Sequence, residues 1–149
     1  MNTVVKASTL PYTEFYKVLS NNLKHHDFQY HLGECVDTIP FIPEEEYSKG
    51  GLYISDINNI LEFLDFGNKI VTIRLRPDED VYIEYKKYKV HSLNIIDISS
   101  AGEFIEKHII ELRHQINSKV FDRCASNVYE STIMLLKHEF PELVPEVSE

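Results

Sequence analysis

The feature that most constrains the fold of this chain is a change in hydrophobic period near Ser99–Ser100. Between Lys69 and Ile98, apolar and polar residues alternate, which is typical of half-buried β-strands. Beyond residue 100, apolar residues recur every three or four positions, as they do on one face of an α-helix. A strand-rich part followed by a helix-rich part predicts an α+β fold, in which helices pack on a small antiparallel or mixed sheet.

The alternating region contains three consecutive strand patterns. Residues 69–76 and 81–85 alternate, Pro77–Asp80 supplies a turn between them, and a longer β-rich run covers residues 88–98. Short polar connections between such strands favour an antiparallel meander.

Shorter signals precede this region. We expect residues 1–12 to form a flexible arm. Thr13 is then placed to cap a short helix. The apolar stripe of that helix is formed by Phe15, Val18 and Leu19. Alternation over residues 28–32, which ends at Gly33, predicts a short strand.

The clearest local signal is a strand followed at once by a helix. Gly51–Ser55 predicts the strand, Asp56 is placed to cap the helix, and Gly67 ends it. The helical stripe is formed by Ile57, Ile60, Leu61 and Leu64. Before the strand, residues 37–50 predict a loop, and we interpret its acidic run Glu44–Glu46 as a solvated segment.

Beyond Ser100, two amphipathic helices are expected to form a hairpin over residues 100–140. Ser99 or Ser100 caps the first helix, and Glu103 lies in its first turn. Pro141 ends the second helix. The apolar stripes consist of Phe104, Ile105, Ile109, Leu112 and Ile116 in the first helix and of Val120, Phe121, Cys124, Val128 and Leu135 in the second.

These signals predict four segments along the chain. They are a flexible arm over 1–12, an α+β core over 13–99, a helical hairpin over 100–140 that packs on the core, and a frayed tail over 141–149.

Composition excludes several classes of function. The 24 acidic and 15 basic side chains give a net charge of −9, which disfavours nucleic-acid binding by the whole surface. No apolar run is long enough to span a bilayer, and residues 1–6 lack the apolar core of a signal peptide. Cys35 and Cys124 are too few for a disulfide framework, which suits a reducing compartment such as the cytoplasm. Cys124 falls on an apolar stripe, so we expect a packed, inert thiol.

Motifs for metal or cofactor chemistry are incomplete. His25–His26 and His31 lie near Cys35, but adjacent histidines rarely ligate one ion together, so a polar turn is the better interpretation. Glu111 and His114 have the spacing of di-iron ligands without a second such pair. We therefore expect no metal and no cofactor.

Basic residues gather in the strand-rich part, namely Lys69, Arg74, Arg76, Lys86, Lys87 and Lys89. Arg74 and Arg76 share one face of a strand, close in sequence to three tyrosines, so a local surface for an anionic ligand is one hypothesis. Lysines that protect a sheet edge from aggregation are the simpler interpretation.

Several ordered blocks of the sequence are distinctive, namely His26–Gly33, Gly50–Ile60, Phe63–Gly67, Ile70–Ile73 and Lys87–Ile96. Together, over roughly residues 14–98, they resemble the N-terminal domain of giant-virus ankyrin-repeat proteins. Residues 101–149 carry no Thr-Pro-Leu-His signature of ankyrin repeats. The resemblance implies a viral protein that acts in the host cytoplasm or in a viral factory.

The order of the predicted elements is similar to the middle of ADP-ribosyltransferase folds, which is a more remote similarity. It implies a pocket with Tyr30 or His31 on its first strand and with Tyr53 and Ser55 on its second. In those enzymes, a late glutamate stabilises the charge that develops on the ribose.

That glutamate is missing from its expected place. Glu84 comes too soon after the pocket strand, and residues 88–98 offer only Asp97. Oxocarbenium-like chemistry needs a carboxylate in the pocket to stabilise its transition state. The chain is therefore expected to be a binding or scaffolding relative of such folds.

The sequence leaves two main functions open. The first is a non-catalytic module that binds a host or viral protein, with the helical hairpin as a docking or dimerising element, so that a homodimer is one option.

The second is an ADP-ribosyltransferase-like or nucleotide-binding enzyme. Its candidate catalytic residues are His31, Tyr53, Ser55 and Glu84, and its candidate ligand-binding residues are Tyr30, His31, Tyr53, Ser55, Arg74 and Arg76. Nucleic-acid binding through the basic residues ranks third.

Overall fold

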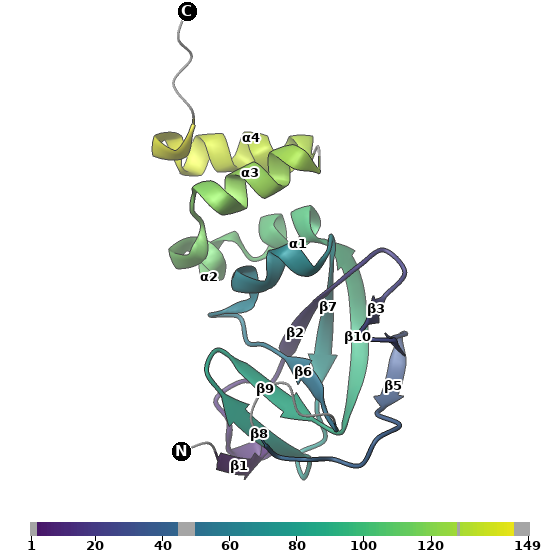
Figure 1. Ribbon diagram of the computed structural model, residues 1–149. Coiled ribbons are helices and arrows are strands. Elements are labelled where there is room, and N and C mark those ends of the chain that lie inside the picture. The colour runs from purple at the N-terminus through teal and green to yellow at the C-terminus, as the bar shows by residue number, and fades with distance from the viewer. Residues whose placement is uncertain (1–2, 45–49, 128, 145–149) are drawn as a thin grey trace, which may run out of the picture.

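The computed structural model describes residues 3–44, 50–127 and 129–144, and it has the α+β fold predicted from the sequence. Antiparallel sheets occupy one end of the molecule and helices stack on the other (Figure 1). The helices α3 (Ser118–Ser126) and α4 (Glu130–Glu139) lie farthest from the sheets.

In the described residues, the strands form two four-stranded antiparallel sheets and one short hairpin. The first sheet has the order β1 (Thr3–Lys6), β8 (Asp80–Glu84), β9 (Lys87–Val90) and β6 (Leu52–Ile54). The second sheet has the order β2 (Phe15–Leu19), β7 (Lys69–Arg74), β10 (Ser92–Ser100) and β5 (Gly33–Val36). The hairpin joins β3 (Lys24–His25) to β4 (Phe28–Gln29).

An antiparallel bridge joins the two sheets. The backbone N–H groups of Tyr16 and Ser55 each donate to the other residue's carbonyl oxygen at 2.8 Å, so that β2 lies beside β6. The joined sheets therefore run in one order from β1 to β5, and these two strands are its open ends.

The helical segments in the described residues are η1 (Ala7–Thr9), η2 (Ile60–Phe66), α1 (Ala101–Lys107), α2 (Ile109–Leu112), η3 (Arg113–Gln115), α3, α4 and η4 (Pro141–Leu143), where η marks a 3-10 helix. Two of the helical segments, η1 and η2, lie between strands, and the others follow β10.

Two apolar cores share strand β2. Phe15 and Leu19 belong to a core built from both sheets, together with side chains such as Val71 and Val90. Tyr16 and Val18 belong to a second core, which β2 and β7 form with η2 and the C-terminal helices. Because alternate side chains of a strand point to opposite faces, β2 separates the two cores.

Several local predictions are confirmed. The strand within Gly51–Ser55 is β6, and the helical segment that ends at Gly67 is η2. The hydroxyl of Ser100 accepts the N–H of Glu103 at 3.1 Å and caps α1. Pro141 follows directly after the C-cap residue of α4.

The helix predicted from Thr13 is wrong, because residues 15–19 form strand β2. Every residue of β2 is buried, and both of its faces contact a core. A strand that is buried on both faces loses the alternation of polar and apolar residues that distinguishes it from a short helix.

The flexible arm predicted over residues 1–12 is wrong from Thr3 onward. β1 pairs antiparallel with β8, from Thr3 opposite Ile83 to Lys6 opposite Asp80. Ladder hydrogen bonds therefore hold this segment at the edge of the first sheet.

The predicted meander is correct only for β8 and β9, which form a hairpin. β7 pairs with β2 and β10 instead of β8. The run over 88–98 breaks at His91, where the chain passes from one sheet to the other. The strand predicted over 28–32 is shorter than expected, because only Phe28–Gln29 form a strand, β4, and the next strand, β5, begins at Gly33.

The predicted helical hairpin is more divided than expected. His108 separates α1 from α2, and α3 and α4 replace the single second helix. Val128, residues 45–49 and residues 145–149, which belonged to a predicted helix, loop and tail, lie outside the described residues. In the part that is described, no helix is long and apolar enough to cross a membrane.

Packing of α4 on the second core should be essential for stability. Leu136 of α4 is fully buried, whereas Met134 on the same helix is 71% exposed. We expect Leu136→Ala to lower the free energy of unfolding by about 2–5 kcal/mol, measured by chemical denaturation, because it leaves a cavity. Met134→Ala, the matched control, should change it by no more than about 0.5 kcal/mol. Equal losses in the two variants would contradict this packing.

Candidate functional site

Two clefts among the described residues, of about 440 and 380 Å³, are lined by residues other than Tyr30, His31, Tyr53 and Ser55. Tyr30 is buried, with its ring 4.7 Å from that of Phe28 between centroids. The side chain of His31 is exposed, and its Nδ1 lies 2.8 Å from its neighbour's carbonyl oxygen. The buried hydroxyl of Ser55 donates to the carbonyl oxygen of Lys86 at 2.9 Å. These groups are therefore used within the fold.

Glu84 is nevertheless a neighbour of Tyr53, although its place in the sequence argued against this. The Tyr53 hydroxyl donates to Glu84 Oε1 at 3.0 Å. The Nζ atom of Lys87 lies 3.8 Å from Glu84 Oε2 and 4.6 Å from the centroid of the Tyr53 ring. Strands β6, β9 and β8 are neighbours in the first sheet, which brings these three side chains together. Sheet pairing, not chain order, therefore decides which of these side chains meet.

Sequence reasoning missed the most unusual polar group, which is Lys17 on β2. Its side chain is buried, donates to the Tyr53 carbonyl oxygen at 2.7 Å and lies 5.4 Å from the centroid of the Tyr30 ring. No carboxylate among the described residues is within ion-pair distance of Lys17. Burial, with a smaller contribution from the charge of Lys87, lowers the pKa of Lys17 to about 7. The one signal in the sequence was a lysine inside an otherwise apolar segment.

The predicted basic surface is largely neutralised or covered. Lys86 pairs with Glu62 at 2.7 Å, and Arg74 lies 3.8 Å from Glu14. Arg76 forms an ion pair with Glu34. Lys89 is fully buried and donates to the carbonyl oxygen of Ile42 at 2.9 Å, and burial lowers its pKa. These contacts leave little concentrated positive charge for an anionic ligand.

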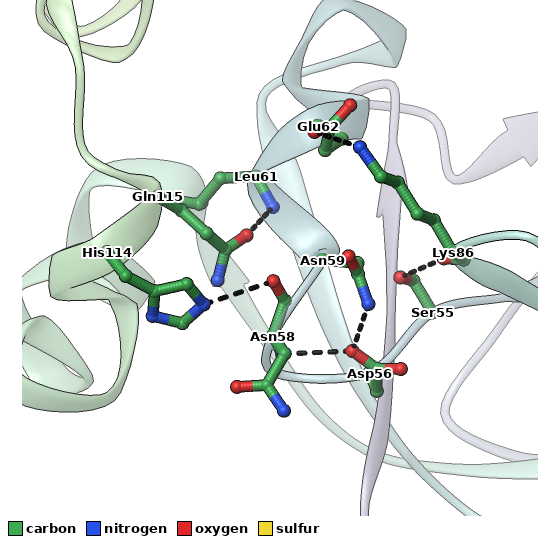
Figure 2. A network of polar contacts seen from close by, with 9 residues as sticks. All are labelled: Ser55, Asp56, Asn58, Asn59, Leu61, Glu62, Lys86, His114 and Gln115. Atoms are coloured by element: carbon green, nitrogen blue, oxygen red, sulfur yellow. Dashed lines mark hydrogen bonds and ion pairs between the residues drawn. The ribbon is translucent and has the colours of Figure 1, made fainter.

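The structure contains a polar cleft of about 440 Å³ between η2 and the start of α3. In Figure 2, Gln115 crosses from η3 to η2, where its Oε1 accepts the N–H of Leu61 at 2.9 Å. Its Nε2 donates to the carbonyl oxygen of Ile57 at 2.6 Å. His114 Nε2 lies 3.3 Å from the carbonyl oxygen of Asn58. These bonds fasten the helical part to the turn before η2.

Asp56 organises the other side of the same network. Its Oδ1 accepts the N–H of Asn58 and the side-chain amide of Asn59, both at 2.9 Å (Figure 2). Its Oδ2 accepts the hydroxyl of Tyr88 at 2.6 Å. Burial and this hydrogen bond raise the pKa of Tyr88. The sequence placed Asp56 as the cap of the helix, but the N-cap residue of η2 is Asn59. Asp56 instead holds the turn before η2 and connects it to the first sheet.

The environments of Cys124, His25 and His26 are those of side chains packed within the fold. Cys124 is buried in the helical core, and burial raises its pKa to about 11. The rings of His25 and His26 are tilted by 41° with centroids 4.1 Å apart, and burial lowers the pKa of His25 to about 3. In the described residues, no group of three or more His, Cys, Asp or Glu side chains is arranged to hold a metal ion.

Exposed apolar side chains lie at the open end of the second sheet. Leu32 is 61% exposed and Val36 is 45% exposed, and Ile39 and Ile96 are also exposed. Ile96 follows Ile95, which is the partner of Gly33, so it lies on β10 beside the start of β5. We name these four residues, Leu32, Val36, Ile39 and Ile96, the β5 edge patch. Figure 1 shows β5 at the margin of the sheet.

Comparison of the chain with protein-family models, with curated proteins and with solved structures finds no match.

Burial of Lys17 should make stability depend on pH. The folded-state pKa near 7 lies below the ordinary value of 10.5, so the unfolded chain binds more protons between these pH values and stability rises with pH. Below about pH 7, the cost of the buried charge is fully present. We expect Lys17→Met to raise the free energy of unfolding most below pH 7. Its advantage should shrink by about 1 kcal/mol per pH unit between pH 7 and 10.

Chemical denaturation of both proteins across this pH range measures the effect. The control is Lys24→Met, which removes an exposed lysine and should show no such pH-dependent difference from the wild type. A gain for Lys17→Met that is the same at every pH would contradict a depressed pKa.

The bridge made by Gln115 gives a second prediction. Gln115→Leu leaves the N–H of Leu61 and the carbonyl oxygen of Ile57 without their partner, so we expect the free energy of unfolding, measured by chemical denaturation, to fall by about 1–3 kcal/mol. Gln115→Glu keeps the acceptor for Leu61, and its free energy of unfolding should lie between those of the wild type and Gln115→Leu. If Gln115→Leu is as stable as the wild type, these bonds do not hold the helical part to the turn.

Proposed function

We propose that the chain is a non-catalytic protein-interaction module that binds its partner through β5. The observation that carries the proposal is the combination of exposed apolar side chains and an open sheet edge at the same place. Large exposed hydrophobic residues that gather at one site are typical of protein-binding surfaces.

The backbone of β5 is suited to accept another strand. Asp37 donates its N–H to the His91 carbonyl oxygen at 2.9 Å, in the same register that pairs Cys35 with Leu93. Hydrogen-bonded pairs alternate along an antiparallel ladder, so the N–H and C=O groups of Glu34 and Val36 point away from β10. Among the described residues, no group bonds to these outward-facing backbone atoms. A partner segment in extended conformation can therefore continue the sheet.

The polar side chains that suggested an enzyme also support this proposal, because their polar atoms make hydrogen bonds within the fold or are buried. Tyr53 bonds to Glu84, Ser55 bonds to the backbone of Lys86, and Tyr30 is buried. The resemblance of residues 14–98 to a giant-virus domain extends the proposal to a viral protein whose partner is a host or viral protein in the host cytoplasm or viral factory.

The test compares partners captured by the wild type and by two variants from lysate of infected cells. Val36→Lys places a charge in the β5 edge patch, and Met134→Lys makes the same charge change at an exposed site on α4. We expect Val36→Lys to lose a partner that the wild type and Met134→Lys both retain, because charge on an edge strand opposes pairing. A captured protein that binds all three equally, or no capture by the wild type, would contradict binding of a separate protein through β5.

A second candidate function rests on one contact. The hydrogen bond from Tyr53 to Glu84 supplies the carboxylate that an ADP-ribosyltransferase-like pocket needs. Such an enzyme should be stabilised by NAD, by about 2.7 kcal/mol at a concentration 100-fold above its dissociation constant. We expect no NAD-dependent shift in thermal melting. A shift that disappears in Glu84→Gln, accompanied by transfer of a group detected by mass spectrometry, would favour the enzyme instead.

A further inference from the structure

We infer that a second copy of this chain pairs with β5, strand against strand and antiparallel, about a two-fold axis at Cys35. The inference rests on the proposed function, because it names the partner at the same edge. The paired strands would join the second sheets of the two copies into one continuous sheet.

The backbone of β5 is self-complementary in this arrangement. Glu34 and Val36 carry the outward-facing N–H and C=O groups, and they lie symmetrically on either side of Cys35. Placing Cys35 on the axis sets Glu34 opposite Val36 of the second copy. Each such pair exchanges two backbone hydrogen bonds, and the axis repeats the pair. No shift or bulge in β5 is needed.

Side chains and charge fit the same register. On the solvent face, Val36 meets the aliphatic stem of Glu34 from the second copy, so no two like charges stand directly opposite each other. The carboxylate of Glu34 already forms an ion pair with Arg76 of its own chain. The edge can therefore be covered without bringing an uncompensated charge to the centre of the contact.

The two open ends of the joined sheets differ in a way that favours β5. β1 ends in Lys6, whose ammonium group pairs with Asp80 at 2.7 Å beside the open edge. β5 contains neither lysine nor proline, the residues that commonly protect an edge strand from pairing. The exposed apolar side chains of the β5 edge patch also lie at this end.

Net charge gives the contact a distinctive dependence on salt. Each copy carries −9, so two copies repel at low ionic strength, and screening should strengthen their association. A cationic partner on the same edge would show the opposite dependence, because salt weakens attraction between opposite charges.

Sedimentation velocity over a range of protein concentrations tests the inference. We expect the wild type to shift from monomer towards dimer as concentration rises. Val36→Glu places a second carboxylate directly opposite Glu34 of the other copy, so its dissociation constant should be at least tenfold higher (roughly the effect of an unpaired charge at a small contact). Added salt should lower the wild-type dissociation constant. Met134→Glu, the control with the same charge change at an exposed site on α4, should dimerise like the wild type. A wild type that stays monomeric at every concentration, or a Val36→Glu variant that dimerises equally, would overturn the inference.

The register has its own test. Glu34→Cys and Val36→Cys each place a thiol on the solvent face, and in the paired strands the two positions face each other at about 5.5 Å between Cα atoms, within reach of a disulfide. Mild oxidation of a mixture of the two variants should therefore give a cross-link between positions 34 and 36, identified by peptide mass spectrometry. Either variant alone should give several-fold less. Equal yields in the mixture and in the single variants would overturn the proposed register.

Failure of this inference can be told apart from failure of the proposed function. A monomeric wild type that still captures a partner lost in Val36→Lys keeps the module and removes the second copy as its occupant. Dimers that form while nothing else is captured keep the self-association and remove a separate protein partner.

Discussion

The joint between β2 and β6 is the constraint on which the rest of the structure depends. Two backbone hydrogen bonds between Tyr16 and Ser55 hold the edges of two sheets together. The ammonium group of Lys17 adds a third contact when it donates to the Tyr53 carbonyl oxygen. Because Asp56 follows Ser55 directly, the same joint also fixes the turn into η2. The C-terminal helices pack against η2 in the second core.

The same joint lies beside the residues that the sequence placed in a pocket. Tyr53, Ser55 and Glu84 meet at the first sheet, but their polar atoms bond to one another or to backbone. Burying such groups is favourable only when they are paired, so their pairing is a requirement of the fold. The proposed interaction rests instead on the exposed apolar side chains beside β5.

Sequence patterns predicted the elements that have one buried and one exposed face, or a distinct capping or turn residue at one end. The strand and helix around Asp56, the serine cap at Ser100 and the β8–β9 hairpin are of this kind. β2 could not be recognised because both of its faces are buried, and the helix-like spacing of Phe15, Val18 and Leu19 arose by coincidence. The contact between Tyr53 and Glu84 is set by strand order, which local patterns do not encode. The open edge at β5 likewise became visible only once the pairing of every neighbouring strand was known.

The most direct measurement of the central claim is amide hydrogen exchange along β5, followed by NMR as protein or partner concentration rises. We expect the N–H groups of Glu34 and Val36 to exchange rapidly at high dilution and to become protected on binding. The N–H of Cys35, which the register directs at Leu93, should be protected throughout. Glu34 and Val36 amides that are already protected in the dilute monomer, or that stay unprotected in the complex, would contradict binding through the open edge of β5.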